Sequence, residues 1–346
     1  MMRLPEFRYR SPRAITEAAE WLAADPAGTM LLAGGTDLLP NMKRRQQTPR
    51  TLIGLRGIRE LGEISNGDGL TIGAGVTLAT LTGDARIQQS YVGLWQAARQ
   101  VATPPLRNMG TIGGNLCLDT RCTYYDQTYE WRKSIDFCLK KDGSTCWVAT
   151  SSPKCLAVSS TDTAPVLQAL GASVTLVSSR GHRVLPVAEL FANDGMYYLT
   201  RQADEILTAV ALPSPTGWRS SYWKLRRRGA FDFPVAAAAV AARFEGPVVT
   251  DVRIVLGAVA SRPVESERAA ALVRGARLTD ELITEAAAIA SDVAKPMDNT
   301  DFELVWRKTM VRTLVSNALC EVRGDDTRAK RRQLARSEML IPVPQP

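Results

Sequence analysis

Hydrophobic spacing in the first third of the chain alternates between helical and strand-like periods. Apolar residues at helical intervals predict a helix over residues 14–24 and another over 94–101, which Pro104-Pro105 is expected to end. A short helix is expected after Thr77, which would be its N-cap. Compact apolar runs predict three strands, at residues 29–33, 51–55 and 70–76. This succession is typical of an α/β arrangement.

The same kind of pattern resumes after residue 160 and stops at a loop rich in proline and glycine. A helix is predicted over residues 164–170, and strands are predicted over 172–177 and 205–212. Residues 213–217 read Pro-Ser-Pro-Thr-Gly, a strong loop signal. We therefore expect a domain boundary at this loop.

The part after this loop predicts a smaller unit of mixed structure. Residues 233–240 form an apolar run that fits either a buried strand or a buried helix. Periodicity predicts one strand at 251–259 and three helices, at residues 265–273, 279–293 (with Thr279 as N-cap) and 301–322. From residue 325 the chain is charged and then ends in a proline-rich stretch, which we expect to be an arm or tail.

These elements exclude an all-α or all-β fold and predict an α+β fold whose N-terminal part is α/β-like. The predicted division is a first domain at residues 1–216, a C-terminal α+β domain at 217–324, and the arm or tail at 325–346.

Composition and charge narrow the class of protein. Of the 346 residues, 45% are hydrophobic and 23% are charged, as in ordinary soluble globular proteins. No apolar run approaches the ~18–20 residues of a membrane span, and residues 1–6 lack the apolar core of a signal peptide, so a cytoplasmic location and no membrane partner are expected. The formal charge of +8 is scattered and not interleaved with stacking aromatics, which argues against nucleic-acid binding. A docking face for partner proteins, or for an acidic cofactor or substrate, fits the charge better.

Histidine is nearly absent. The one histidine, His182, stands in a turn-like Ser-Arg-Gly-His-Arg stretch, where a surface role is expected. A catalytic triad or a metal site built on histidine is therefore almost excluded. Any redox or transfer chemistry would be left to a cofactor.

Two glycine-rich turns stand out in the first domain. Residues 33–37 read Ala-Gly-Gly-Thr-Asp directly after a predicted strand, and residues 111–115 read Thr-Ile-Gly-Gly-Asn. Neither matches the spacing of a Rossmann fingerprint or a P-loop. Glycines allow tight turns whose backbone N–H groups can approach a phosphate, so two such turns could form a two-sided pyrophosphate cradle. The alternative for each is a purely structural turn.

Three segments taken together carry a family resemblance. They are Leu-Ala-Gly-Gly-Thr-Asp-Leu at 32–38, Arg-Asn-Met-Gly-Thr-Ile-Gly-Gly-Asn at 107–115 and Ser-Thr-Asp-Thr-Ala-Pro at 160–165. In this order they resemble the FAD-binding medium subunit of the xanthine dehydrogenase (molybdenum hydroxylase) family. The stretch from residue 222 resembles that family's C-terminal flavoprotein domain, so the resemblance extends over about residues 5–323.

The resemblance implies an FAD site between the two domains. It assigns the pyrophosphate to two sets of residues, namely Ala33, Gly34, Gly35, Thr36, Asp37, Leu38 and Leu39, and Thr111, Ile112, Gly113, Gly114 and Asn115. It places Asp162 near the adenine or ribose and Lys224 near the flavin. From the residues alone, Asp162 fits equally a helix N-cap, and Lys224 fits a solvated charge.

Five of the six cysteines lie in one window: Cys117, Cys122, Cys138, Cys146 and Cys155. Clustered thiols in a chain without an export signal favour a metal or iron–sulfur centre over disulfides. The spacing contains no C-x-x-C pair, so a four-cysteine zinc site and unligated thiols both stay open. Cys320, far away on an apolar helix, is expected in the core.

The window is an insertion, at about residues 117–158, of about 40 residues between the second and third family motifs, far longer than an ordinary connection. In this it is similar to the medium subunit of the 4-hydroxybenzoyl-CoA reductase subfamily, which carries an additional [4Fe–4S] cluster in such a loop. That resemblance implies four ligands, Cys122, Cys138, Cys146 and Cys155. Cys117 directly follows the second turn and is expected in the core or near the flavin. Lys133, Lys140 and Lys141 would then meet an acidic electron donor, or simply be solvated.

The implied function is electron transfer without a substrate site on this chain. The implied partners are a molybdopterin-binding large subunit, a small subunit with two [2Fe–2S] clusters, and a ferredoxin as donor, in a dimer of heterotrimers. The implied reaction is reductive dehydroxylation of 4-hydroxybenzoyl-CoA to benzoyl-CoA in anaerobic aromatic degradation. The alternatives are a medium subunit of an oxidative molybdenum hydroxylase, a stand-alone FAD oxidoreductase, and a zinc-stabilised binding module without redox function.

Overall fold

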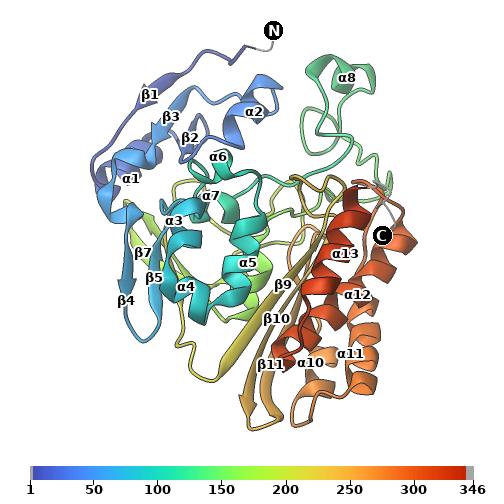
Figure 1. The fold of residues 1–346 in the computed structure, drawn as a ribbon. Coiled ribbons are helices and arrows are strands. Elements are labelled where there is room, and N and C mark those ends of the chain that lie inside the picture. The colour runs from blue at the N-terminus through green and yellow to red at the C-terminus, as the bar shows by residue number, and fades with distance from the viewer. Residues whose placement is uncertain (1–2, 340–346) are drawn as a thin grey trace.

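The computed structural model describes residues 3–339 and contains three β-sheets surrounded by helices (Figure 1). Thirteen α-helices and twelve strands are assigned in this part of the chain, as are three short 3-10 turns at Leu55–Gly57, Arg59–Gly62 and Val187–Glu189. Within the same residues, no helix combines the length and apolar character needed to cross a membrane.

The first sheet is parallel and small, in the order β1-β3-β2. Its strands are β1 (Arg8–Arg10), β2 (Thr29–Leu32) and β3 (Thr51–Gly54). Helix α1 (Ile15–Ala24) buries Ala18, Ala19 and Leu22 in a core shared with β3. Helix α2 (Leu38–Lys43) follows β2 directly, so the first glycine-rich turn joins the end of a strand to the start of a helix.

The second sheet is antiparallel, in the order β4-β5-β8-β6-β7. Its strands are β4 (Ile64–Asn66), β5 (Leu70–Gly73), β6 (Ser173–Ser178), β7 (Gly181–Pro186) and β8 (Ile206–Leu212). The helices of this part are α3 (Leu78–Gly83), α4 (Ala85–Ser90), α5 (Val92–Gln100), α6 (Pro104–Arg107), α7 (Ile112–Leu116) and α9 (Thr163–Ala169). The expected cap of α3 is present, because the Thr77 hydroxyl accepts the N–H of Thr80.

The third sheet is antiparallel, in the order β12-β11-β10-β9, and is buried on both faces over much of its area. Its strands are β9 (Trp218–Leu225), β10 (Ala236–Glu245), β11 (Val248–Gly257) and β12 (Val264–Glu265). One face packs on α5 and α9. The other face packs on the C-terminal helices, which are α10 (Glu267–Val273), α11 (Asp280–Asp292), α12 (Leu304–Arg323) and α13 (Arg328–Met339).

This double burial explains the apolar run that the sequence left undecided between helix and strand. Residues 236–242 are all fully buried and belong to β10, with Ala237, Ala239 and Ala241 in the N-terminal core and the alternate residues in the C-terminal core. A strand with two buried faces has no polar alternation to identify it. The fold class itself is as predicted: a mixed α/β first part and a smaller C-terminal domain.

Two expectations need correction. Pro104 and Pro105 do not end the helix before them, since α5 ends at Gln100 and Pro104 begins α6. Proline suits this place because the first turn of a helix needs no N–H donor. The expected arm or tail begins with helix α13, where Arg331 stacks 4.1 Å over the Trp223 ring; residues 340–346 lie outside the described part.

The long connection between α7 and α9 holds the cysteine window and only one helix, α8 (Tyr129–Ser134). In Figure 1 this segment projects beyond the sheets beside α2 and near the top of α12. It is tied to the C-terminal domain by two bonds of Asn299, whose carbonyl accepts the Thr123 N–H at 2.9 Å and whose amide donates to the Leu156 carbonyl at 2.6 Å.

Arg307 on α12 ties together three chain segments of the C-terminal domain. Its guanidinium is fully buried and donates to the carbonyls of Val235, Met297 and Ala258, each at 2.9 Å. The Met297 carbonyl also accepts the Asn299 N–H at 2.8 Å. A buried carbonyl without a donor is costly, so Arg307 matters most for the carbonyls of Val235 and Ala258.

We expect Arg307→Met to lower the free energy of unfolding by about 3 kcal/mol, because it removes the arginine donor from the buried carbonyls of Val235 and Ala258 and one of the two donors from the Met297 carbonyl. Equilibrium urea unfolding measures this change. Arg312→Met is the matched control, since Arg312 is exposed on the same helix and should cost less than about 1 kcal/mol. Equal effects of the two changes would contradict the structural role of Arg307.

Candidate functional site

The two glycine-rich turns lie against each other although they are far apart in the sequence. A Cβ added to Gly34 would come within 2.0 Å of the Met109 carbonyl oxygen, and one added to Gly110 would lie 3.5 Å from the Thr36 hydroxyl. Gly35 has a φ of +72°, a conformation that side chains with a Cβ rarely adopt. Glycine is therefore required at 34 by contact and at 35 by backbone geometry.

The two turns differ in what they offer a ligand. In the first turn, the N–H groups of Gly35 and Thr36 donate to no acceptor among the described residues. In the second turn the N–H groups are used internally: Ile112 donates to the Val76 carbonyl at 3.0 Å, and Gly113 donates to the Ala74 carbonyl at 2.9 Å. The backbone N–H groups of the first turn can thus bind a phosphate. The second turn has no such free N–H groups at Ile112 and Gly113, but its glycines allow a ligand to approach its backbone closely.

The other expected residues of the two turns are at least partly buried. Ala33 directly follows β2 and is half-buried, as are Leu38 and Leu39 at the start of α2. Ile112, the first residue of α7, is fully buried. The Thr111 hydroxyl caps α7 by accepting the Gly114 N–H at 3.0 Å.

Asn115 acts inside the protein. Its side-chain oxygen accepts the Thr161 hydroxyl at 2.8 Å, the Thr163 hydroxyl at 2.7 Å and the Thr163 N–H at 3.1 Å. These bonds hold the start of α9 against the second turn. The second and third family motifs are therefore one structural unit.

Asp162 and Lys224 form a buried ion pair. The Lys224 ammonium donates to Asp162 at 3.0 Å and to the Gln100 carbonyl at 3.0 Å, and the Tyr222 hydroxyl donates to Asp162 at 2.7 Å. Burial raises the pKa of the Asp162 carboxyl, against the opposing effect of the Lys224 charge. Asp162 does stand at the N-cap position of α9, but its side chain makes no cap bond. Lys224 is buried, so its alternative as a solvated charge is wrong.

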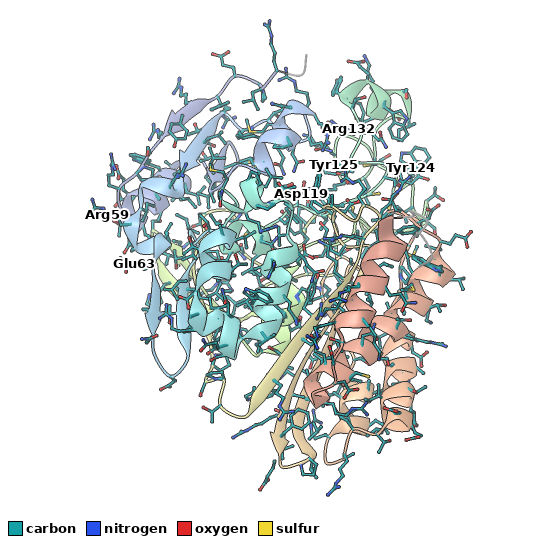
Figure 2. The ribbon with its side chains drawn as sticks, viewed as in Figure 1. Arg59, Glu63, Asp119, Tyr124, Tyr125 and Arg132 are labelled. Carbon is teal, nitrogen blue, oxygen red and sulfur yellow. The ribbon has the colours of Figure 1, made fainter. Side chains whose placement is uncertain are left out.

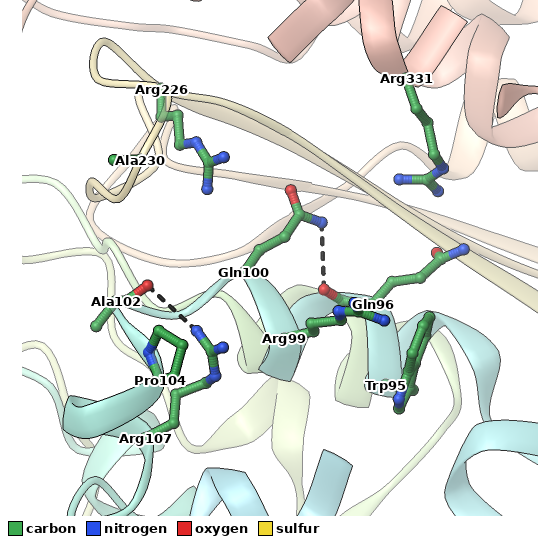
Figure 3. Close-up of a pocket in the computed structure, with 10 residues that line it drawn as sticks. All are labelled: Trp95, Gln96, Arg99, Gln100, Ala102, Pro104, Arg107, Arg226, Ala230 and Arg331. Carbon is green, nitrogen blue, oxygen red and sulfur yellow. Dashed lines mark hydrogen bonds between the residues drawn. The ribbon is translucent and has the colours of Figure 1, made fainter. Parts of the chain in front are cut away.

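A pocket of about 420 Å³ lies between the two domains, next to this pair. Gln100, whose carbonyl holds Lys224, is part of its wall. Figure 3 shows the residues of the N-terminal part on one side and those of the C-terminal domain on the other; they are Trp95, Gln96, Arg99, Gln100, Ala102, Pro104 and Arg107, then Arg226, Ala230 and Arg331.

The pocket is strongly basic. Desolvation and the neighbouring charge of Arg99 lower the pKa of Arg107, which donates to the carbonyls of Val101 and Ala102 at 2.9 and 3.2 Å. Arg331 is neutralised by Glu321. The arginines of this wall suit a ligand with negative charge or carbonyl oxygens.

The cysteine window brings its thiols together in the interior of the loop. Cys122, Cys138 and Cys155 share one small cluster with Tyr125 and Ala157, and Cys146 is also buried. Mutual electrostatic effects connect all four, because Cys138 and Cys155 raise the pKa of Cys122, and Cys146 raises that of Cys155.

Burial raises the pKa of three of these thiols, to about 12 for Cys122 and to about 11 for Cys155. Backbone N–H groups oppose this effect, and each stands two residues after its cysteine: Tyr124 for Cys122, Lys140 for Cys138 and Ala157 for Cys155. The last is a hydrogen bond of 3.4 Å to Sγ. Within residues 3–339, no three His, Cys, Asp or Glu side chains form a group that could hold a single metal ion.

Cys117 stands apart from the other four. It ends α7, packs half-buried against the N-terminal core, and has a pKa raised by burial. The remaining cysteine, Cys320, is buried on α12 in the C-terminal core.

Several buried charges around the loop were not identified from the sequence. Lys140, expected at the surface, is buried and donates to Asp119 at 2.8 Å and to the Gly195 carbonyl at 2.6 Å. Arg132 is buried in α8, and Arg121 pairs with Asp37 of the first turn. Figure 2 shows Arg132, Tyr125 and Asp119 following one another from α8 towards the interior. The one sequence signal is that Arg121 and Lys140 stand next to or near the cysteines.

Comparison with known proteins gives matches over nearly the whole chain. The family described as "FAD binding domain in molybdopterin dehydrogenase" matches residues 5–215, and "CO dehydrogenase flavoprotein C-terminal domain" matches residues 220–322.

Individual relatives agree with these matches. The FAD-binding subunit PaoB of an aldehyde oxidoreductase from Escherichia coli K12 is 30% identical, with 90% of this chain and 98% of the relative covered. The nicotine 6-hydroxylase medium subunit of Paenarthrobacter nicotinovorans is 28% identical, with 92% and 98% covered. A solved carbon monoxide dehydrogenase from Hydrogenophaga pseudoflava superposes with a TM-score of 0.76 at 27% identity, over 93% of this chain and 98% of that one.

We expect Gly34→Ala to weaken FAD binding strongly, because the added Cβ forces the Met109 carbonyl, and with it the second turn, away from the first. Titration of FAD fluorescence with the purified protein measures the dissociation constant. Gly62→Ala, where a Cβ meets nothing within 4 Å, should leave the constant unchanged. Unaltered FAD binding by Gly34→Ala would show that the facing turns are not the site.

Proposed function

The chain belongs to the FAD-binding medium subunits of the molybdenum hydroxylases, and we propose that it is the electron-transfer subunit of an enzyme of the 4-hydroxybenzoyl-CoA reductase type. In this proposal it accepts electrons from a ferredoxin and delivers them towards a partner subunit that binds the substrate. The observation that carries the finer assignment is the inserted loop, in which Cys122, Cys138 and Cys155 share one buried cluster. Cys146 is also buried and acts electrostatically on Cys155.

The residues of the two turns fit the pyrophosphate of FAD. The N–H groups of Gly35 and Thr36 are available to it, and Gly114 presents no side chain where the second turn faces Ala33. Backbone N–H groups at a strand-to-helix turn are a common phosphate site in proteins. When bound, FAD supplies the exchange of electrons, for which no side chain of this protein is a substitute.

We place the flavin ring in the basic pocket between the domains. The volume of about 420 Å³ is within the usual range for a cofactor site. Lys224 and Asp162 lie directly behind the wall at Gln100, so they would position the wall and set its electrostatic field while paired with each other. The resemblance placed Asp162 near the adenine or ribose of FAD and Lys224 near the flavin. We propose an indirect role instead, because separating the two side chains would leave an unpaired buried charge.

The cysteine loop fits an iron–sulfur cluster by its donors. Four thiolates can hold a [4Fe–4S] cluster, which when bound supplies one-electron transfer at low potential. N–H groups directed at Cys122, Cys138 and Cys155 would stabilise the thiolate forms that a cluster requires. The buried ammonium of Lys140 acts in the same direction on Cys138 and Cys155.

The proposed assembly follows the family. Relatives are named as medium subunits or medium chains, which supports a complex with a large molybdopterin-binding subunit and a small subunit with two [2Fe–2S] clusters. We propose a dimer of such heterotrimers in the cytoplasm, with the ferredoxin binding near the cysteine loop. The exposed charge of Lys133 on α8 suits an acidic donor.

The second candidate function is a medium subunit of an oxidative molybdenum hydroxylase. Relatives such as the nicotine 6-hydroxylase and carbon monoxide dehydrogenase subunits favour it by their names, and several relatives are named for FAD without mention of a cluster. The intact complex distinguishes the two. Reduction of 4-hydroxybenzoyl-CoA with reduced ferredoxin supports the first, and oxidation of an aromatic substrate with an electron acceptor supports the second.

We expect about four irons and one FAD per chain in protein purified without oxygen, and we expect Cys138→Ser to lose the iron while retaining FAD. Iron analysis together with the visible spectrum measures both. Cys117→Ser is the matched control and should retain iron, because Cys117 lies in a different core.

Zinc in place of iron would contradict the redox role of the loop and support the zinc-stabilised site, while leaving the FAD site standing. Loss of iron in Cys117→Ser with retention in Cys138→Ser would show that the ligand set is wrong.

A further inference from the structure

Arg121 occupies a junction between three parts of the chain. Its guanidinium pairs with Asp37 of the first glycine-rich turn, lies 3.6 Å from the carboxylate of Asp126 in the cysteine loop, and stacks 4.3 Å from the ring centre of Phe233 in the C-terminal domain. Its backbone exchanges two hydrogen bonds with Val158, of 2.8 and 2.7 Å. The first glycine-rich turn and the cysteine loop thus share one buried cation.

The position of Asp37 makes this cation necessary. Asp37 stands in the turn whose N–H groups face the proposed pyrophosphate site, and an isolated carboxylate there would repel a pyrophosphate. One carboxylate oxygen pairs with Arg121, and the other accepts the N–H of Asp119 at 3.3 Å. The side chain of Arg121 is only 9% exposed, so solvent screens this interaction weakly.

Arg121 is also connected to Cys122 of the cysteine loop through Asp126. The second oxygen of Asp126 accepts the backbone N–H of Cys122 at 3.2 Å. Arginine stays protonated in proteins, so Arg121 carries a positive charge between the carboxylates of Asp37 and Asp126. One guanidinium therefore balances a carboxylate on each of the two sites.

We propose that Arg121 is a positioning residue that neutralises Asp37 so that the first turn can accept a pyrophosphate, and that it couples this turn to the cysteine loop through Asp126. The inference rests on the proposed FAD and cluster sites and assigns a role to a residue that belongs to neither. Because coupling between two binding sites is reciprocal, a loaded loop should favour FAD, and bound FAD should favour the loaded loop.

The loop has further attachments that do not depend on Arg121. The Gln46 amide donates to the Tyr125 carbonyl at 2.6 Å, Arg132 donates to the Arg44 carbonyl at 2.9 Å, and Gln47 donates to Asp119 at 3.2 Å. All three join the loop to the end of α2. A protein without the Arg121 charge should therefore keep the loop docked.

The test is a charge rescue, read as the FAD dissociation constant and the iron content per chain. Arg121→Met should weaken FAD binding by at least about fivefold, the lower end of typical couplings between sites, because Asp37 is then an unbalanced charge. Adding Asp37→Asn should restore FAD affinity, since no charge remains to repel the pyrophosphate. Iron content should fall in Arg121→Met and stay low in the double variant, because Asp126 still lacks its partner.

Arg121→Lys keeps the charge in a shorter side chain and should lie between the wild type and Arg121→Met for FAD binding. Arg50→Met is the control, because it removes an arginine–aspartate pair that is exposed and distant from the turn, and it should match the wild type in both measurements. Thermal unfolding followed by circular dichroism verifies that each variant is folded.

Unchanged FAD affinity in Arg121→Met would overturn the proposal. A loss of affinity that Asp37→Asn does not rescue would also overturn it, since the role of Arg121 would then be structural. These outcomes differ from failure of the proposed function. Wild-type protein that binds no FAD would contradict the FAD site itself, and wild-type protein with FAD but without iron would contradict the cluster while leaving the charge rescue measurable.

Discussion

Burial of the third sheet on both of its faces is the constraint on which the rest of the structure depends. Strand β10 presents alternate small residues to two different cores, so the helices of the N-terminal part and those of the C-terminal domain pack on the same layer of backbone. Alanine allows both sets of helices to approach closely. The basic pocket, Lys224 and the Asp162 pair all lie where the two parts meet around the end of β9. The pocket proposed for the flavin is thus formed by the domain interface.

Buried charges are the second organising feature, and each joins segments that are distant in sequence. Lys224 meets Asp162, Arg121 meets Asp37, and Lys140 meets Asp119. Removing one partner from such a pair leaves an uncompensated buried charge, which is strongly unfavourable. The family motifs would assign Asp37, Asp162 and Lys224 to the ligand. In the structure, these side chains instead pair with each other or with other buried charges and so hold the motifs together. In the proposed FAD site, the backbone of the first turn and the pocket walls would bind the ligand.

The cysteine loop is a long insertion in a fold that is otherwise that of an FAD-binding medium subunit. It docks on α2, whose N-terminal end is the first glycine-rich turn, and it is fastened to the C-terminal domain through Asn299. A loop attached at both places is held close to the FAD site, and electron transfer between two centres requires such proximity. This placement is consistent with the redox role proposed for the thiols.

Local signals in the sequence determined most elements of the fold and the identity of the candidate site. Periodic helices, the glycine-rich turns and the number of inserted cysteines are readable from neighbouring residues, because helical spacing, tight turns and thiol chemistry are local properties. The sequence did not distinguish strand β10 from a helix, because burial on both faces removes the alternation of apolar and polar residues that identifies a strand. Only the tertiary structure decided which N–H groups remain available, and that Asp37, Asp162 and Lys224 face internal partners. A charge is neutralised by whatever lies within a few ångströms, and that neighbour is fixed by the folded chain.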